Sequence, residues 1–401
     1  MSTANPYRPG VGLQPAYLAG RGLSLTAFKR LLDGAPEIPA NARVTGLRGV
    51  GKTVLLQRFQ AEAETRNWST IFTEIEPRHT DDEAFFQLIQ NLTNEHHKRV
   101  SSSARAKEAV ADFVGAARQT LRVTYQGFEW SLAGDLDAGT RSTAEMLLSA
   151  TKDAIDSHRV GLVILLDEAQ ILTDEREAPG SHALSSLIAA VSLLQKQNVP
   201  VSLVLCGLPT LTVNLLRART YSERMFRGFK VDSLGRREAQ DAFTRPLEGT
   251  GISAAPDLVD KVVTDVGGYP YFIQLWGAEL WDAAAEDGRS QITTAVLQET
   301  EARIRSRLDL DFYEPRVDSL RPSEQDLLLA SASCSYPPLV VAELNSKSPK
   351  SNENINVLLG RLVNANVLYR ERKGKYFYTA PGFREYLVRR ASEPEDAATL
   401  F

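Results

Sequence analysis

Short apolar runs alternate with amphipathic segments along the first 235 residues of the chain. The apolar runs predict strands, and two of them, at 160–166 and 200–206, are almost entirely apolar, as is typical of strands that are buried on both faces. The strands predicted are residues 42–47, 69–76, 160–166 and 200–206. Helical periodicity fills the intervals, at 23–34, 52–66, 81–121, 141–158 and 182–197. This alternation predicts an α/β fold with a parallel sheet flanked by helices.

One segment departs from this alternation. Residues 121–134, LRVTYQGFEWSLAG, alternate apolar and polar side chains around a Gln-Gly pair. This period of two with a turn at its centre predicts a β-hairpin inserted before the next helix.

The pattern changes at residue 236, where helical periodicity replaces the strand signal. Residues 257–268, 271–286 and 292–308 predict a helical lid domain. Residues 319–392 then contain three short helical segments, two strands around the Lys373-Gly374 turn, and a last helix, which is the element order of a winged helix. The predicted domains are a core at 1–235, a lid at 236–318, a winged helix at 319–392 and a flexible tail at 393–401.

Composition narrows the class of protein. The 401 residues are 43% hydrophobic and 24% charged, with a net charge of −4, so the chain as a whole is neither disordered nor strongly basic. Its two cysteines, Cys206 and Cys334, form no paired motif, and we expect buried thiols in a reducing compartment. No leader sequence and no apolar run of membrane-spanning length occurs, so a cytoplasmic protein without a membrane partner is expected.

A phosphate-binding loop follows the first strand of the predicted sheet. Residues 46–53, GLRGVGKT, match G-x-x-x-x-G-K-[ST] and lie between a strand and a helix. Glycines turn backbone N–H groups toward an anion, Lys52 would reach the β and γ phosphates of ATP, and Thr53 would ligate Mg²⁺. The nucleotide-contacting residues predicted are Gly46, Gly49, Val50, Gly51, Lys52, Thr53 and Val54. The alternative is a tight turn that uses glycine for steric reasons alone.

Two acids follow the next fully apolar strand. In LVILLDEAQIL, residues 162–172, Asp167 would hold the metal ion and its water shell, and Glu168 would orient or activate water beside the γ-phosphate. Phosphoryl transfer to water depends on this kind of positioning and charge neutralisation. The alternative is a strand end with two solvated acids.

Together the two motifs resemble the Walker A and Walker B motifs of AAA+ ATPases and of the related signal-transducing (STAND-type) ATPases. The segment YLAGR, residues 17–21, resembles the one that borders the adenine pocket in the initiator and signalling branches, which implies Arg21 and Tyr17 as neighbours of the base. GGYPYFIQLWG, residues 267–277, resembles the lid motif whose proline, here Pro270, packs near the base. Tyr271 stands where relatives often carry an arginine that senses the γ-phosphate. This difference favours slow turnover, with the nucleotide acting as a switch.

Two further segments match the family less closely. VLCGLPTL, residues 204–211, resembles a sensor segment in which Thr210 is the available polar side chain. YSERMFRGFKVDSL, residues 221–234, resembles the segment whose arginine reaches the nucleotide of a neighbouring subunit. Arg224 is the arginine finger that this likeness implies, with Arg227 and Arg219 as substitutes, and an ATP-dependent homo-oligomer would follow. A surface ion pair is the alternative.

Basic residues are concentrated in the last domain. Residues 321–401 contain eleven Lys and Arg against nine Asp and Glu, a net charge of +2 in an acidic chain. Winged helices commonly place their third helix in the major groove of DNA, while the wing contacts phosphate. The DNA contacts predicted are Arg361 on the third helix and Arg370, Arg372, Lys373 and Lys375 on the wing. The alternative is a winged helix that serves as a protein-interaction or autoinhibitory module.

These observations predict an ATP-binding and ATP-hydrolysing switch whose nucleotide state and oligomerisation control a winged helix acting on duplex DNA, as in initiator, transposition or genome-defence ATPases. The main alternative is a STAND-type signalling ATPase whose winged helix binds a protein partner of unknown identity. A metabolic P-loop kinase and a binding module without catalysis are weaker alternatives.

Overall fold

The computed structural model describes residues 4–10, 12–111, 138–174, 182–348 and 352–392. The hairpin predicted at 121–134 and the tail predicted at 393–401 lie outside the described residues. The chain divides into two compact units. The core unit comprises Arg21–Gly46 and Lys52–Val231, and the C-terminal unit comprises Asp232–Phe401 together with Met1–Gly20 and the loop Leu47–Gly51.

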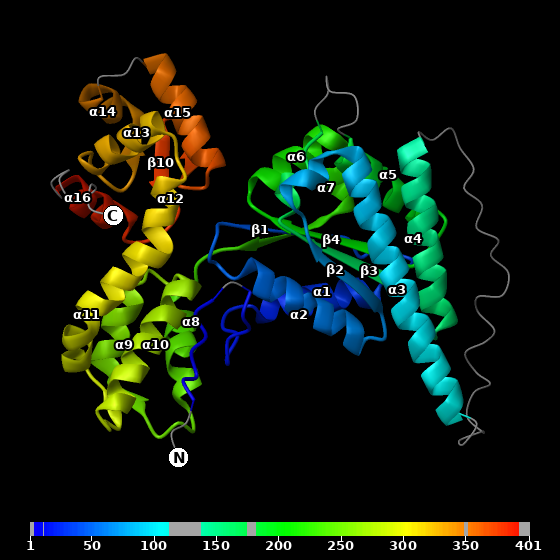
Figure 1. Ribbon diagram of the computed structural model, residues 1–401, viewed down its shortest axis with the longest axis horizontal. Coiled ribbons are helices and arrows are strands. Elements are labelled where there is room, and N and C mark those ends of the chain that lie inside the picture. The colour runs from blue at the N-terminus through cyan, green and yellow to red at the C-terminus, as the bar shows by residue number, and fades with distance from the viewer. Residues whose placement is uncertain (1–3, 11, 112–137, 175–181, 349–351, 393–401) are drawn as a thin grey trace, which may run out of the picture. The chain divides into compact units, whose positions relative to one another are not determined.

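A five-stranded parallel sheet organises the core unit, which confirms the predicted α/β fold (Figure 1). The strand order is β2-β3-β4-β1-β5, so β4 lies between β3 and β1. The strands are β1 (Ala42–Gly46), β2 (Ser69–Glu74), β3 (Leu162–Asp167), β4 (Val201–Gly207) and β5 (Arg227–Val231). All residues of β3 and β4 are buried, because helices cover both faces of the sheet.

The register brings the carboxyl ends of the strands to one edge of the sheet. Glu74 at the end of β2 pairs with Asp167 at the end of β3, and Thr45 of β1 pairs with Gly207 at the end of β4. In an open α/β sheet this edge is where ligands bind.

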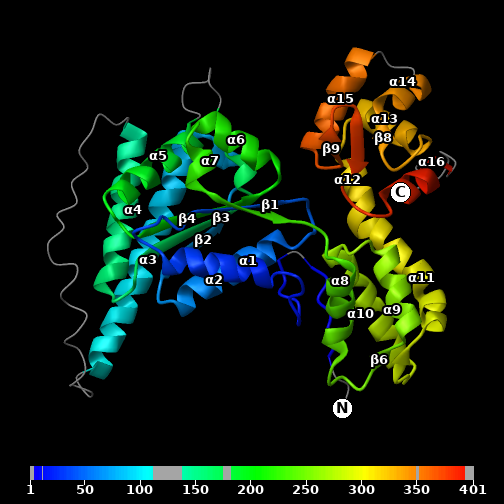
Figure 2. The same ribbon diagram turned by 180° about the vertical axis from the view of Figure 1, so that it is seen from behind.

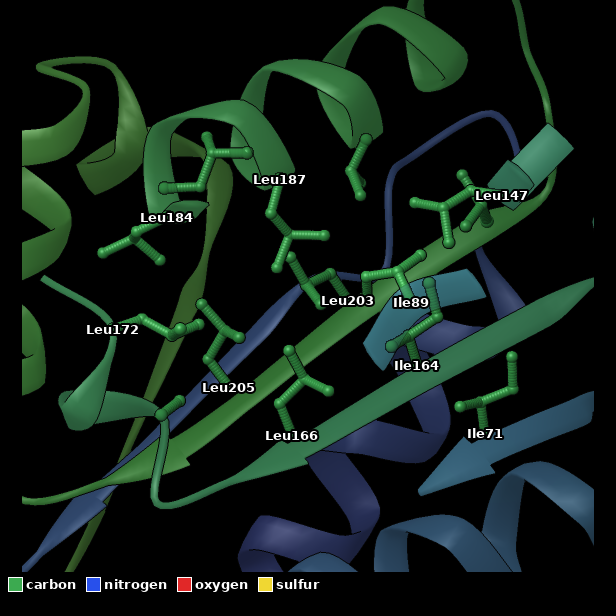
Figure 3. Packing of buried hydrophobic residues seen from close by; sticks show 14 of the residues in the cluster. Ile71, Ile89, Leu147, Ile164, Leu166, Leu172, Leu184, Leu187, Leu203 and Leu205 are labelled. Atoms are coloured by element: carbon green, nitrogen blue, oxygen red, sulfur yellow. The ribbon is translucent and has the colours of Figure 1, made fainter. Parts of the chain in front are cut away.

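Two layers of helices enclose the sheet (Figures 1 and 2). The helices of the core unit are α1 (Gly22–Asp33), α2 (Lys52–Thr65), α3 (Asp82–Ala111), α4 (Ala138–Asp156), α5 (Ala183–Lys196), α6 (Thr210–Ala218) and α7 (Ser222–Met225), with short turns η1 (Pro77–Thr80) and η2 (Ala169–Ile171). On one face, Leu184 and Leu187 of α5 pack onto Leu203 and Leu205 of β4 (Figure 3). On the other face, Phe28 of α1 stacks on Phe59 of α2, with ring centroids 4.0 Å apart.

The C-terminal unit begins with the helical lid predicted from the sequence. Its elements are α8 (Arg236–Thr244), η3 (Arg245–Leu247), β6 (Ser253–Ala254), α9 (Pro256–Asp265), α10 (Pro270–Glu286), β7 (Gln291–Ile292), α11 (Thr294–Leu308), the π-helical turn η4 (Asp309–Tyr313) and α12 (Glu314–Asp318). The N-terminal segment packs on the same unit: Tyr7 is buried, and its hydroxyl donates to the Phe243 carbonyl at 2.5 Å.

The end of the chain has the element order and sheet of a winged helix. Its elements are α13 (Pro322–Ala332), β8 (Leu339–Val340), α14 (Val341–Lys347), α15 (Asn352–Asn364), β9 (Leu368–Arg372), β10 (Lys375–Tyr378) and α16 (Phe383–Ser392). The strands form an antiparallel sheet in the order β8-β10-β9. The β9-β10 turn contains Gly374 at φ +78°, a backbone conformation that favours glycine.

Candidate nucleotide site

The phosphate-binding loop connects β1 to α2. Gly46 ends β1 and Lys52 begins α2, while Gly49 and Gly51 have φ of +76° and +89°. Alternation of right- and left-handed conformations in such a loop turns successive N–H groups to one side, where they can hold an anion. A glycine is required at these two positions for conformational reasons as well, because other residues rarely adopt such φ values.

Lys52 is buried at the start of α2, with only 6% of its surface exposed. A buried ammonium group needs anionic or polar partners. Lys52 and Asp167 both lie close enough to the Cys206 thiol, near the end of β4, to affect its pKa. Burial raises the pKa of the Cys206 thiol well above its usual range, the Asp167 carboxylate raises it further, and Lys52 acts in the opposite direction. The fold therefore brings together the lysine and aspartate that were predicted from separate motifs.

Asp167 and Glu168 occupy different environments although they are adjacent in sequence. Asp167 is buried, and its Oδ1 accepts a hydrogen bond from the Glu168 N–H at 2.9 Å. Glu168 itself is partly exposed and has φ +50° and ψ +28°. A residue other than glycine in this left-handed region stores conformational strain, which is common at functional sites. This conformation ends the extended backbone of β3 at Glu168.

Glu74 is an acid at this edge that the sequence interpretation did not assign. It ends β2 beside Asp167, and its pKa is raised, first by desolvation and then by the negative charges of Asp167 and Glu168. Its position near the carboxyl end of a predicted strand was the available signal. Glu74 adds negative charge where a divalent cation would be held.

The described residues contain no group of three or more His, Cys, Asp or Glu side chains arranged to hold a metal ion by themselves. Thr53 and Asp167 fit Mg²⁺ of the kind bound with a nucleotide, since magnesium takes few protein ligands and completes its shell with phosphate oxygens and water.

Within the C-terminal unit, Tyr269 packs against the tip of the phosphate-binding loop. Its hydroxyl donates to the Arg48 carbonyl, and a Cβ built on Gly49 would lie 2.4 Å from the Tyr269 hydroxyl oxygen. The Arg316 guanidinium stacks 3.4 Å from the Phe312 ring centroid, and burial lowers its pKa. Neither Tyr269 nor Arg316 was assigned from the sequence, although Tyr269 directly precedes the predicted Pro270.

The residues that the family resemblance implied as neighbours of the base differ in burial and in contacts. Arg21 is buried, with 9% of its surface exposed, immediately before α1. Pro270 is the first residue of α10, where the missing N–H is harmless. Tyr17 is 38% exposed and lies under the Arg245 guanidinium, 5.8 Å from ring centroid to Cζ. Tyr271 stacks on Phe312 as part of the lid interior, with ring centroids 5.6 Å apart.

The sensor and finger residues differ in exposure. Thr210 is the first residue of α6. Arg224 lies on the short helix α7, just before β5, and is exposed, as is Arg227. Arg219 is partly buried, and its Nε has no hydrogen-bond partner among the described residues. Exposure is what a residue reaching a neighbouring subunit requires.

The basic residues of the winged helix lie mainly on its surface. Arg370, Arg372 and Lys373 are exposed on β9 and its turn, and Lys375 is partly exposed on β10. Arg361 on α15 is also exposed, and its Nη1 lies 3.7 Å from Oε1 of Glu324, a buried residue of α13. Arg361 therefore has an ion-pair partner within the same domain.

The two cysteines are buried and unpaired, as expected. Among the residues that the structure describes, none of the helices has both the length and the apolar character needed to cross a membrane.

Comparison with known proteins gives two family matches and a set of similar structures. Residues 40–215 match an AAA domain, and residues 310–387 match a domain of unknown function (DUF8462). None of the curated proteins compared matches the chain.

Two of the similar solved structures span almost the whole chain. The ORC2 protein of Aeropyrum pernix, solved as ADPNP-ADP complexes, has a TM-score of 0.60 at 13% identity, over 95% of each chain. The Walker-type ATPase PABY2304 of Pyrococcus abyssi has a TM-score of 0.55 at 18% identity, over 95% of this chain and 98% of that one. At these identities the similarity establishes the fold.

Proposed function

We propose that the chain binds and hydrolyses ATP as a molecular switch of the AAA+ type, because residues 40–215 match an AAA domain and the fold is similar to that of a Walker-type ATPase. In this proposal the nucleotide state and the self-association of the chain control the winged helix at 319–392, through the lid at 236–318.

One observation carries the proposal: Lys52, Asp167 and Glu168 meet at the carboxyl edge of one parallel sheet. The intervening strand β4 separates β3 from β1, so the acids and the loop are neighbours across one strand rather than side by side. The alternative interpretation of the two motifs is a tight turn and a pair of solvated acids. It would not require both Lys52 and Asp167 to be buried.

In this proposal each residue of the site has a separate role in ATP binding or hydrolysis. Backbone N–H groups of Leu47–Gly51 and the Lys52 ammonium would bind the β and γ phosphates, while Val50 and Val54 would line the cradle. Thr53 and Asp167 would hold Mg²⁺, which neutralises charge on the phosphates. Glu168 would orient the attacking water and accept its proton. Arg21 and Pro270 would contact the base, and Arg224 would reach the nucleotide of an adjacent subunit.

Hydrolysis is tested by measuring ATP binding and phosphate release for the wild type, Lys52→Ala and Glu168→Gln. We expect Lys52→Ala to weaken ATP binding about 100-fold or more, because it removes a charged phosphate contact. Glu168→Gln should keep ATP affinity and lose about 100-fold or more in phosphate release, because it removes the base. Equal rates for wild type and Glu168→Gln would remove Glu168 from its assigned role.

The same assay tests Arg224. Arg224→Ala subunits should be inactive alone. When they are mixed with Lys52→Ala subunits, activity should return at interfaces where one subunit supplies Lys52 and its neighbour supplies Arg224. Mass measurement with a non-hydrolysable ATP analogue should show the oligomer. Persistent monomers would contradict the role of Arg224.

For the winged helix we propose duplex DNA as the partner, supported by the exposed basic side chains of β9 and its turn. Replacing Arg370, Arg372, Lys373 and Lys375 by alanine should abolish a mobility shift with duplex DNA at moderate salt, since each phosphate contact contributes to a salt-dependent affinity. The matched control replaces four exposed basic residues of the core unit, Arg30, Lys98, Arg141 and Lys152. If the wild type gives no shift, or both variants bind equally, a protein partner for the winged helix is the better interpretation.

A further inference from the structure

Gln170 makes two side-chain hydrogen bonds at the end of the sheet. It belongs to the short turn η2 that follows the two acids of β3. Its Nε2 donates to Oε2 of Glu168 at 2.5 Å, and its Oε1 accepts from the Leu208 N–H at 3.0 Å. The amide thus bridges the Glu168 carboxylate and the backbone that leaves β4.

The position of this amide is fixed by its surroundings. Gly207, the last residue of β4, has no side chain, and a Cβ built there would lie 2.2 Å from Gln170 Oε1 and 3.1 Å from its backbone nitrogen. The Gln170 carbonyl in turn accepts a hydrogen bond from Asn214 Nδ2 of α6 at 2.8 Å. Both ends of the residue are therefore held, the side chain by its bonds to Glu168 and Leu208 and the backbone by its bond to Asn214.

The register shows what lies beside this amide. Gly207 pairs with Thr45 of β1, one residue before Gly46 and the phosphate-binding loop. The segment after β4 was expected to contribute a polar side chain here, with Thr210 as its only option. Because Gln170 fills the space above Gly207, the polar group at the end of β4 comes from the turn after β3 instead.

We propose that Gln170 is a positioning residue for ATP hydrolysis, which acts through Glu168. Its amide holds the Glu168 carboxylate in one orientation and ties that orientation to the end of β4, beside the phosphate-binding loop. A charge-assisted hydrogen bond of this kind restricts the rotamers of a partly exposed glutamate, so that the base is aligned before water and ATP arrive. This inference rests on the proposed hydrolysis of ATP by Glu168.

The test compares kcat for ATP hydrolysis and the Kd for ATP in wild type, Gln170→Met and Gln170→Glu. Gln170→Met has a similar length and loses both hydrogen bonds. Gln170→Glu can still accept from the Leu208 N–H, but replaces the donor to Glu168 by a second carboxylate. We expect kcat to fall about 10- to 100-fold in both variants, while the Kd for ATP changes less than about 3-fold, since the interaction affects the base and not the phosphate contacts.

A double-mutant cycle separates positioning from stability. In a Glu168→Gln background, Gln170→Met should cause no further loss of kcat, because the residue through which it acts has already been removed. The matched control is Gln87→Met, since Gln87 of α3 makes a similar amide-to-carboxylate bond with Glu83 at 2.9 Å, away from the site. It should leave kcat unchanged. Thermal unfolding of every variant checks that the chain is folded.

Three results would overturn the inference: wild-type kcat in Gln170→Met, wild-type kcat in Gln170→Glu, or an equal loss from Gln170→Met in both backgrounds. Each of these leaves the proposed hydrolysis intact, because wild type would still hydrolyse ATP faster than Glu168→Gln. A wild-type protein that releases no phosphate would instead refute the proposed function, and with it the role of Gln170. If Gln170→Met fails to fold, Gln170→Glu provides the test, because it retains the bond to Leu208.

Discussion

At the scale of single residues, the phosphate-binding loop shows that two glycines in one motif can be required for different reasons. A Cβ on Gly51 would meet no atom within 4 Å, so its backbone conformation alone favours glycine there. Gly49 has a similar φ and also lies against Tyr269, whose side chain is almost completely buried. The sequence shows glycine at both positions, but it does not show that the physical reasons differ.

Gly49→Ala should therefore destabilise the protein more than Gly51→Ala. The conformational cost of alanine at positive φ is about 1–2 kcal/mol at either position. At Gly49, crowding against Tyr269 adds about 1–3 kcal/mol, because a buried ring has little room to move. Denaturant unfolding without nucleotide measures the free energy of unfolding of the two variants. In a Tyr269→Ala background, the difference between Gly49→Ala and Gly51→Ala should become smaller. Equal destabilisation by the two alanines would show that the Tyr269 contact is not tight.

At the scale of elements, the packing of α3 on β2 depends on one buried histidine. His96 of α3 shares a hydrogen bond with the Ser69 hydroxyl of β2, 2.7 Å from oxygen to Nε2, and only 2% of its surface is exposed. Burial lowers the pKa of His96 to about 4, with a further decrease from Arg99 and an opposing effect of Asp153. The folded protein thus holds His96 neutral over a range in which the unfolded chain binds a proton.

This histidine predicts a loss of stability in mild acid. Between about pH 6.5 and pH 4 the unfolded chain takes up a proton that folded His96 does not, so the free energy of unfolding should decrease as the pH falls through this window, by about 3 kcal/mol at the limit. His96→Gln can keep a hydrogen bond to Ser69 without titrating, and should flatten the decrease. Denaturant unfolding at several pH values measures it. The control is His97→Gln, since His97 is exposed, and an unchanged slope in His96→Gln would contradict the assignment.

At the scale of the whole molecule, the C-terminal unit joins the lid to the winged helix through an aromatic junction. Tyr313 of η4 is buried, its ring stacks on Tyr386 of α16 with centroids 5.2 Å apart, and its hydroxyl donates to the Pro381 carbonyl at 2.5 Å. Arg389 of α16 donates to both carboxylate oxygens of Asp309, at 2.6 and 2.8 Å. A winged helix held in this way would follow the lid rather than move independently.

Tyr313→Ala should release the winged helix from the lid. The substitution removes a buried aromatic ring and a hydrogen bond, a loss of about 3–5 kcal/mol. Unfolding should then separate into two transitions, and limited proteolysis should cut near residues 309–320. Arg389→Ala removes a partly exposed ion pair and should have a smaller effect, about 1 kcal/mol or less. A single unchanged transition in Tyr313→Ala would show that the junction contributes little to the stability of the unit.

Local patterns in the sequence predicted four of the five strands of the parallel sheet and most of its covering helices, although not β5 or α6, together with the phosphate-binding loop and the acids at the end of β3. These follow from periodicity and from residue types whose chemistry is tied to short spacings, so Lys52, Thr53, Asp167 and Glu168 were identified without a structure. The parallel sheet followed too, because alternating strands and helices allow few other arrangements.

Which residues from distant segments contact one another within each unit depends on the tertiary structure. Glu74 joins Asp167 through strand register, Tyr269 reaches the backbone of Arg48, and Gln170 occupies the space that Gly207 leaves open. A contact of this kind depends on the register, on the φ of Glu168 and on the absence of a side chain at Gly207. The register and the φ of Glu168 have no local sequence pattern, because both are set by packing between elements that are far apart in the chain. The glycine at position 207 is visible in the sequence, but the side chain that fills the space beside it is not.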